Sequence, residues 1–135
     1  MLFFDAFFNM IYNFSNKNLK RDKDNATFSA CGILAVYIGF FVGMVAHIIG
    51  LIKDNYLSRW ALDNAFLAVA PIGLICYITF IIRYDKLIGI ENLEKKIAQQ
   101  PIGKLRNIRY AIYFFLIAVP IGSFVIFRLY MYGHI

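Results

Sequence analysis

The stretch FSACGILAVYIGFFVGMVAHIIGLI, residues 28–52, decides the fold class of this chain. Its 25 residues include no Asp, Glu, Lys or Arg, and a single histidine, His47. A helix needs about 20 apolar residues to cross the roughly 30 Å hydrocarbon layer of a membrane. We therefore expect residues 28–52 to form a membrane-spanning helix.

Two further stretches have the same character, at residues 61–82 and 110–132. Each contains one charged residue: Asp63 near the start of the second stretch and Arg128 near the end of the third. Strands of a membrane barrel would be shorter and would alternate in polarity, which these stretches do not. The sequence predicts an all-α integral membrane protein, a three-span transmembrane helical bundle over residues 28–135.

The composition agrees with this fold class. Hydrophobic residues make up 61% of the 135 residues and charged residues 16%, whereas soluble domains have roughly 45–50% and 25%. A single soluble domain of this length could not hide so much apolar surface. We expect lipid to be the solvent for most of the chain.

The first 14 residues predict an interfacial amphipathic helix. Asp5, Asn9 and Asn13 fall on one helical stripe, and apolar side chains, mostly phenylalanines, cover the rest. Such a helix lies on the bilayer surface, although the absence of Lys or Arg from its polar face leaves docking on a protein partner as an alternative. Residues 15–27 are interpreted as a basic linker.

The basic residues are placed unevenly along the chain. Eleven of the 14 lie before the first span or between the second and third, in residues 15–27 and 83–109, against Lys53 and Arg59 in the other loop. The positive-inside rule then puts the N-terminus and the loop 83–109 in the cytoplasm and the C-terminus outside. We expect a bacterial inner membrane or an organellar membrane, and no nucleic-acid partner, because no recognition motif accompanies the charge.

The loop 83–109 predicts a short amphipathic helix over residues 86–100. Leu87, Ile90, Leu93 and Ile97 recur at helical spacing, and Pro101 and Gly103 end the pattern. A solvated loop helix and a surface for a cytoplasmic partner are both compatible with it. Its basic residues and those that follow are candidates for contact with anionic head groups: Lys95, Lys96, Lys104, Arg106 and Arg109.

The first span carries a stripe of small residues that includes a GxxxG motif at 39–43. In lipid, helices associate through close backbone approach, so small residues mark a contact face. The sequence leaves open whether that face meets another span of the same chain or a second chain. The stripe consists of Gly32, Ala35, Gly39, Gly43, Ala46 and Gly50.

Prolines occur in the middle of the other two spans. Pro71 and Pro120 each remove one backbone hydrogen bond, which frees the carbonyls of Leu67 and Leu116 and favours a kink. Broken helices of this kind present carbonyls to ions in transporters, but no acidic residue lies at mid-depth here. We interpret the two prolines as packing kinks.

Polar groups from all three spans reach a similar depth near the outer boundary. At 1.5 Å per residue, Asp63 and Arg128 lie roughly 4–6 Å inside it, and His47 is only slightly deeper. Charged groups at membrane depth usually pair or face the bundle interior. We expect an Asp63–Arg128 salt bridge with His47 or Asn64 within reach. In the alternative, Arg128 extends to the head groups and Asp63 caps its helix.

No catalytic, metal-binding or cofactor motif occurs in the sequence, so we expect neither an enzyme nor a cofactor. The leading hypothesis is a non-catalytic accessory subunit that binds other membrane proteins, or itself, through helix–helix association. A homo-oligomeric pore, such as a holin or a membrane-disrupting defence effector, is a second hypothesis. An immunity protein against a membrane-acting toxin is the third. A wide pore would need a polar stripe along a whole span, and the span centres lack one.

Overall fold

The computed structural model describes residues 2–53, 60 and 64–132, and three long helices account for most of them. These are α2 (Lys23–Lys53), α4 (Ala65–Ile81) and α6 (Ile102–Met131). Three helical segments are long and apolar enough to cross a membrane, namely Lys23–Ile49, Leu67–Leu87 and Ile102–Leu129. For the described residues, the prediction of an all-helical fold with three helices long and apolar enough to span a membrane is confirmed.

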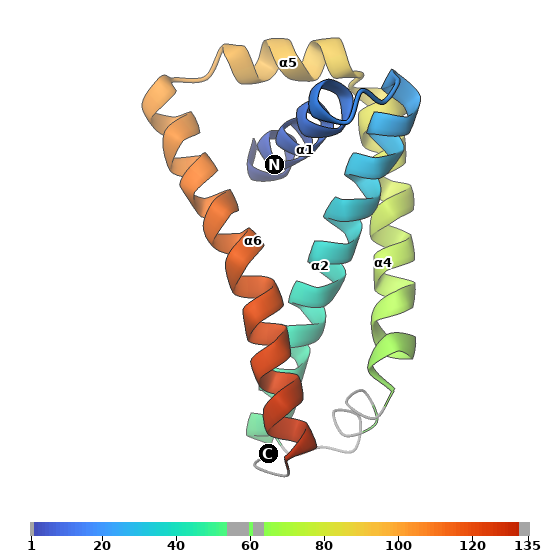
Figure 1. The fold of residues 1–135 in the computed structure, drawn as a ribbon, viewed down its shortest axis with the longest axis vertical. Helices are drawn as coiled ribbons and strands as arrows, with labels where there is room; N and C mark the ends of the chain where they lie inside the picture. Colours follow the sequence, from blue (N-terminus) through green and yellow to red (C-terminus); the bar gives the residue numbers. More distant parts are fainter. Residues whose placement is uncertain (1, 54–59, 61–63, 133–135) are drawn as a thin grey trace.

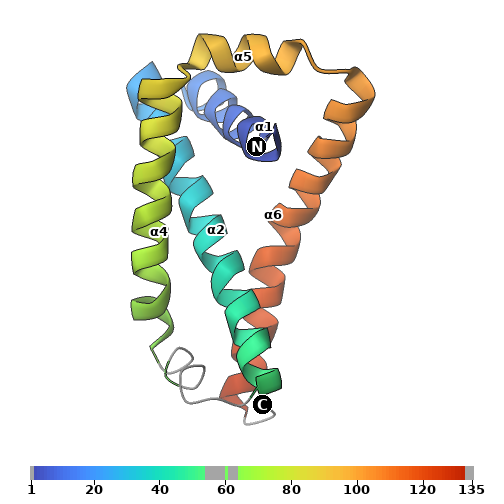
Figure 2. The same ribbon diagram turned by 180° about the vertical axis from the view of Figure 1, so that it is seen from behind.

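The three long helices form an open triangle (Figures 1 and 2). Helix α2 occupies the middle, with α4 beside it, while α6 crosses α2 near one end and diverges from it toward the other. Helix α5 (Ile90–Ala98) spans the open side, and α1 (Leu2–Asn13) lies beneath it, between α2 and α6. We call the end that holds α1 and α5 the wide end, and the end where α2 and α6 cross the narrow end.

Two short π-helical segments continue helices at the wide end. The segment η1 (Phe14–Asn18) follows α1, and η2 (Ile82–Leu87) extends α4. In η2, the Ile88 amide donates to the carbonyl of Arg83 over five residues, 2.9 Å away. Such widened turns change the direction of the side chains that follow, and they occur often at functional sites.

The boundaries between the predicted elements differ from those in the structure. Residues 15–27, expected to be a linker, contain η1 and the first turn of α2, and α6 begins at Ile102 rather than near residue 110. Helix α5 ends at Ala98, and Pro101 immediately precedes α6, as its fixed φ allows. In α5, Ile90, Leu93 and Ile97 are buried, but Leu87 belongs to η2 and is 75% exposed.

The chain reverses direction between η2 and α5 at Gly89. Its φ of 72° lies in the left-handed region, which side chains other than glycine rarely adopt. This turn lays α5 across the wide end, with its apolar face toward α1.

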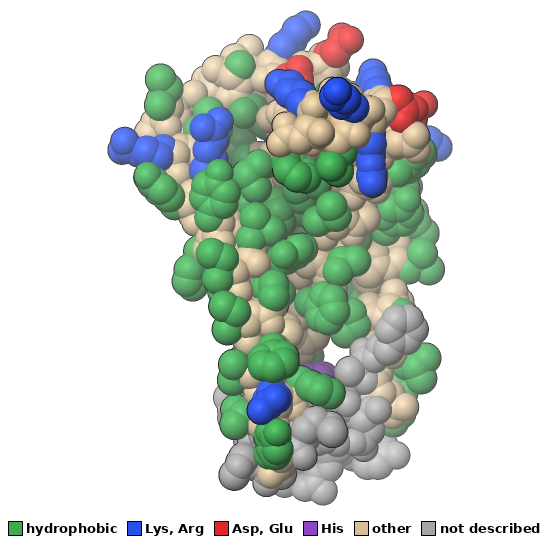
Figure 3. Space-filling view, viewed as in Figure 1, with side chains coloured by type: hydrophobic (Ala, Val, Ile, Leu, Met, Phe, Trp, Pro, Cys, Tyr) green, Lys and Arg blue, Asp and Glu red, His purple; other side chains and the backbone are tan. Residues whose placement is uncertain are grey.

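The buried core sits at the wide end and is built around α1. Phe7 and Phe8 are fully buried, and Phe8 stacks on Tyr84 with ring centroids 4.0 Å apart. Ala26 and Ala30 of α2 are also fully buried and let α1 approach closely. The rest of the spans is apolar and largely exposed, whereas charged side chains gather at the wide end (Figure 3).

Asp5 belongs to the polar stripe expected on the first helix, but it does not face water. The Asp5 side chain has no exposed area, because α1 turns this residue toward η2 and α5. The position of α1 relative to a bilayer surface remains a prediction.

Candidate functional site

A lateral groove between α4 and α6 is the largest hollow in the described part of the chain. Helix α2 forms its floor, and its volume is about 800 Å³. Its lining is almost entirely apolar and includes four members of the predicted small-residue stripe: Gly32, Ala35, Gly39 and Gly43. The walls come from α4 (Val69, Ala70, Gly73, Leu74 and Tyr77) and α6 (Ser123, Phe124, Ile126 and Phe127).

The GxxxG motif lies where α2 meets α4. A Cβ atom added at Gly43 would stand 3.0 Å from Cγ2 of Val69, and one added at Gly39 would stand 3.2 Å from Cγ1 of the same valine. The Cα of Gly73 is 3.8 Å from that second position. The two glycines therefore allow α4 of the same chain to pack closely. Ala46 is exposed, and Gly50 lies beyond the residues whose surroundings are described.

Two polar atoms in the groove lining have no hydrogen-bond partner among the described residues. They are Nδ1 of His47, on α2, and Oγ of Ser123, on α6, and both are buried. Buried polar atoms are almost always paired in folded proteins. Both residues line the groove, but these two atoms have almost no exposed area in this structure.

Other polar side chains within the spans bond to backbone carbonyls of this chain. The Thr79 hydroxyl donates to the carbonyl of Ile75, 2.8 Å away. The Tyr37 hydroxyl donates across from α2 to the carbonyl of Leu116 on α6, at 3.4 Å. Leu116 is the residue whose carbonyl Pro120 deprives of its helical partner, so Tyr37 supplies an interhelical donor for it. Pro71 and Pro120 both lie inside continuous helices.

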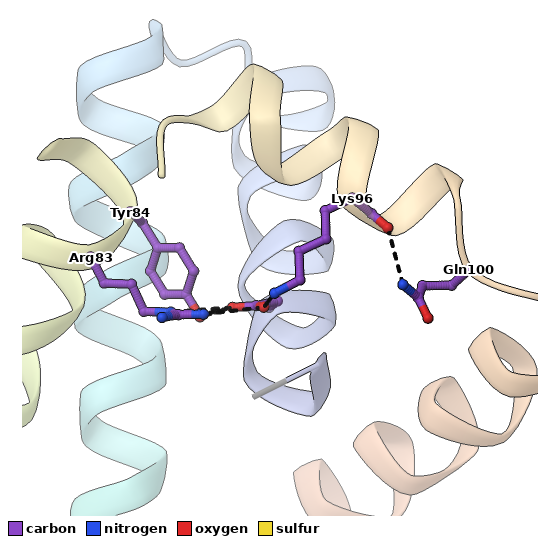
Figure 4. A network of polar contacts seen from close by, with 5 residues as sticks. Arg83, Tyr84, Lys96 and Gln100 are labelled. Atoms are coloured by element: carbon purple, nitrogen blue, oxygen red, sulfur yellow. Dashed lines mark hydrogen bonds and ion pairs between the residues drawn. The ribbon is translucent and has the colours of Figure 1, made fainter. Parts of the chain in front are cut away.

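At the wide end, the buried carboxylate of Asp5 is the centre of an ionic cluster, and Figure 4 shows Arg83, Tyr84 and Lys96 pointing toward it. The guanidinium of Arg83 donates to Oδ1 at 3.0 Å, and the ammonium of Lys96 to Oδ2 at 2.7 Å. The Tyr84 hydroxyl donates to Oδ1 at 3.0 Å. The cluster connects α1 with η2 and with α5.

The electrostatics of the cluster favour the charged carboxylate. Burial by itself raises the pKa of Asp5, but the hydrogen bonds from Lys96, Arg83 and Tyr84 together outweigh it. The pKa of Asp5 is therefore below its ordinary value. This arrangement fits a structural clamp, because both cations and the hydroxyl are committed to one carboxylate.

Sequence reasoning did not find this cluster. Asp5 was assigned to a polar stripe, Arg83 was counted for topology, and Lys96 was assigned to lipid contact. The one local feature that could have indicated a buried charge is a single acidic residue in a helix dominated by phenylalanine. The cations that neutralise it are 78 and 91 residues away in sequence.

The predicted polar network near the narrow end falls partly outside the described residues. Asp63 belongs to that undescribed part. The Arg128 guanidinium stacks over the rings of Phe124 and Tyr132, 5.7 and 5.0 Å from their centroids. Asn64 donates to the carbonyl of Trp60 at 3.1 Å. The Asp63–Arg128 pair remains a prediction.

Among the described residues, no group of His, Cys, Asp or Glu side chains is placed to hold a metal ion. The two cysteines, Cys31 and Cys76, are both free. No protein-family model, no curated protein and no solved structure matches the chain. The groove between α4 and α6 is the candidate functional site.

Proposed function

We propose that this protein is a non-catalytic membrane subunit whose α4–α6 groove receives a transmembrane helix of a different protein. The observation that carries the proposal is the groove itself, an apolar hollow of about 800 Å³ whose α2 floor combines small residues with Val36, Phe40 and Met44. A helix in lipid gains little from the hydrophobic effect, so it associates where backbones can approach closely. A fourth helix laid between α4 and α6 would complete a four-helix bundle.

The two unpartnered atoms would meet an occupant after a change of side-chain rotamer, and they then favour one with hydrogen-bonding groups. His47 and Ser123 come from different helices, and both line the groove. Hydrogen bonds across helices add to association in membranes. We therefore expect the partner helix to carry a small-residue face and a hydroxyl or amide side chain. A lipid acyl chain would fill the apolar volume but would leave both groups unpaired.

The pore hypothesis receives less support from the described spans. A water-filled path would need polar side chains facing one another along its length. Here Thr79 bonds to its own helix and Tyr37 bonds to α6. An immunity protein would be a special case of the proposal, in which the partner helix belongs to a toxin.

Site-specific photocrosslinking in native membranes tests the proposal. A photoreactive residue replaces Ala70, an exposed groove residue on α4, and in a matched control it replaces Ile75, which is 66% exposed and outside the groove lining. We expect one discrete adduct with a different protein from position 70 and none from position 75. The Ser123→Leu variant, which fills the groove, should remove that adduct.

Three results would contradict the proposal. An adduct of twice the 15.6 kDa chain mass would indicate a second copy, and favour the homo-oligomer. Adducts with lipid alone would identify acyl chains as the occupant. Equal protein adducts from positions 70 and 75 would mean that the groove is not the docking surface.

A further inference from the structure

The first turns of α6 combine positive charge with an exposed aromatic surface. We propose that they form a binding site for one anionic phospholipid, with Arg106 and Arg109 holding its phosphate. This proposal is independent of the partner helix, because it concerns the wide end and the outer face of α6.

The residues of this site lie on one stripe of the helix. Ile102, Arg106, Arg109 and Tyr113 are spaced four, three and four residues apart, and with their neighbours Leu105 and Tyr110 they surround a hollow of about 470 Å³. Residues at this spacing share a helix face. The hollow is lined by Ile102, Leu105, Arg106, Arg109, Tyr110 and Tyr113.

The charge of the stripe is not neutralised by the protein. The sequence contains no Asp or Glu after Glu94, and no described carboxylate forms an ion pair with Arg106 or Arg109. Lys96, by contrast, is committed to Asp5 at 2.7 Å, and Lys95 follows Glu91 at the favourable helical spacing. The five basic residues predicted to contact lipid therefore differ in their surroundings. Arg106 and Arg109 are the two that share a hollow.

The chemistry of the stripe matches a phosphate at the membrane boundary. Arginine presents several donors in a planar fork that suits phosphate oxygens. Tyr110 and Tyr113 are 65% and 51% exposed, and tyrosine is enriched where a span enters the head-group region. Their hydroxyls provide additional donors beside the two guanidinium groups.

The apolar side chains below the stripe argue for a lipid rather than free phosphate. Tyr113 is followed on the same helix face by Ile117 and Ile121, which are 61% and 58% exposed. This row continues from the arginines into the apolar part of the span. A head group on the arginines would leave its acyl chains lying along that row.

Native mass spectrometry of the full chain tests the site, with phosphatidylglycerol and phosphatidylcholine of identical acyl chains as probes. We expect retained phosphatidylglycerol to fall by about tenfold in R106Q/R109Q. The matched control K95Q/K104Q removes the same charge from exposed residues at the same end and should change retention by less than about threefold. Equal losses in both variants would indicate diffuse attraction and overturn the site, as would no loss in R106Q/R109Q.

A second measurement keeps both arginines, so it does not depend on the folding of the first variant. In Y113W with W60F, residue 113 carries the only tryptophan. Phosphatidylglycerol with brominated chains should quench its fluorescence at a several-fold lower mole fraction than brominated phosphatidylcholine. Equal quenching by the two lipids would overturn the proposal. Displacement of phosphatidylglycerol by millimolar inorganic phosphate would identify a phosphate site without a role for the chains, and would overturn the lipid assignment.

Discussion

The two ends of the molecule satisfy their polar groups in different ways. At the wide end, the carboxylate of Asp5 is fully buried, and protein donors occupy both of its oxygens. Toward the narrow end, His47 and Ser123 line an apolar groove without a described partner. The buried charge of Asp5 is thus satisfied within the chain, whereas the groove offers an apolar surface that a second molecule would cover.

The largest expected effect concerns which end faces which compartment. A cysteine introduced at Lys20 or at Lys95 should be shielded from a membrane-impermeant thiol reagent in intact cells, and one at Asn55 should be labelled. The reason is the excess of basic residues at the wide end, which cytoplasmic loops retain. The result should be close to all or none, read as a mass shift on a gel. Labelling at Lys95 in intact cells would reverse the predicted orientation.

Next in size is the loss of the buried charge at the wide end. Asp5→Asn should destabilise the folded chain by about 2–3 kcal/mol, because Arg83 and Lys96 would lose their common counter-ion. This loss of stability is smaller than that expected for breaking a fully buried ion pair, since the Lys96 side chain is 44% exposed. The measurement is unfolding in mixed detergent micelles. Asp85→Asn, an exposed acid of η2, is the control and should unfold like the natural chain.

The ionic cluster around Asp5 makes the free energy of unfolding depend on pH. Because the pKa of Asp5 is lowered on folding, its contribution is fully present above the ordinary value of 3.8 and is lost as pH falls below it. The stability difference between the natural chain and Asp5→Asn should therefore stay constant from about pH 5 to pH 8 and shrink below about pH 4. A difference that changes between pH 5 and pH 8 would mean that another group carries the effect.

A smaller effect is expected where α2 and α4 touch. Gly39→Ile combined with Gly43→Ile should reduce stability by about 1–3 kcal/mol, since the added side chains would overlap Val69. Gly103→Ile places the same side chain on α6, where nothing lies within 4 Å of the new Cβ atom, and serves as control. Unchanged unfolding of the double variant would show that the glycines do not hold the two helices together.

The smallest predicted effect is the loss of a single hydrogen bond between α2 and α6. Tyr37→Phe should cost about 0.6 kcal/mol, the average for such bonds between membrane helices. Pro120→Ala would give the Leu116 carbonyl a donor within its own helix again. The Tyr37→Phe effect should then become smaller in a double-mutant cycle. An undiminished effect would show that the hydroxyl acts on something other than this carbonyl.

Local patterns in the sequence were sufficient to predict the three apolar helices and the buried face of the helix in the loop 83–109. The apolar stretches are continuous, so the three membrane-spanning helices could be predicted. The buried face of α5 follows from the spacing of Ile90, Leu93 and Ile97. Each of these features depends on residues only a few positions apart.

The buried cluster could not be predicted from the sequence in the same way. Asp5 meets Arg83 and Lys96 only because η2 and α5 both come close to α1 at the wide end, and helical periodicity carries no information on that arrangement. The groove depends likewise on the divergence of α6 from α4, which no local pattern encodes. The small-residue stripe indicated a contact face on α2 but did not say which helix would meet it.

The clamp on α1 also has a consequence for the order of events during synthesis. Helix α1 is made before the three long helices, but Lys96 is made 91 residues after Asp5. At translation rates of about 5–20 residues per second, this delay is on the order of 5–20 s. The nascent protein therefore holds its first helix without its final ion pairs while the first two spans are being inserted. A helix made before the three long helices is thus among the last to reach its native place.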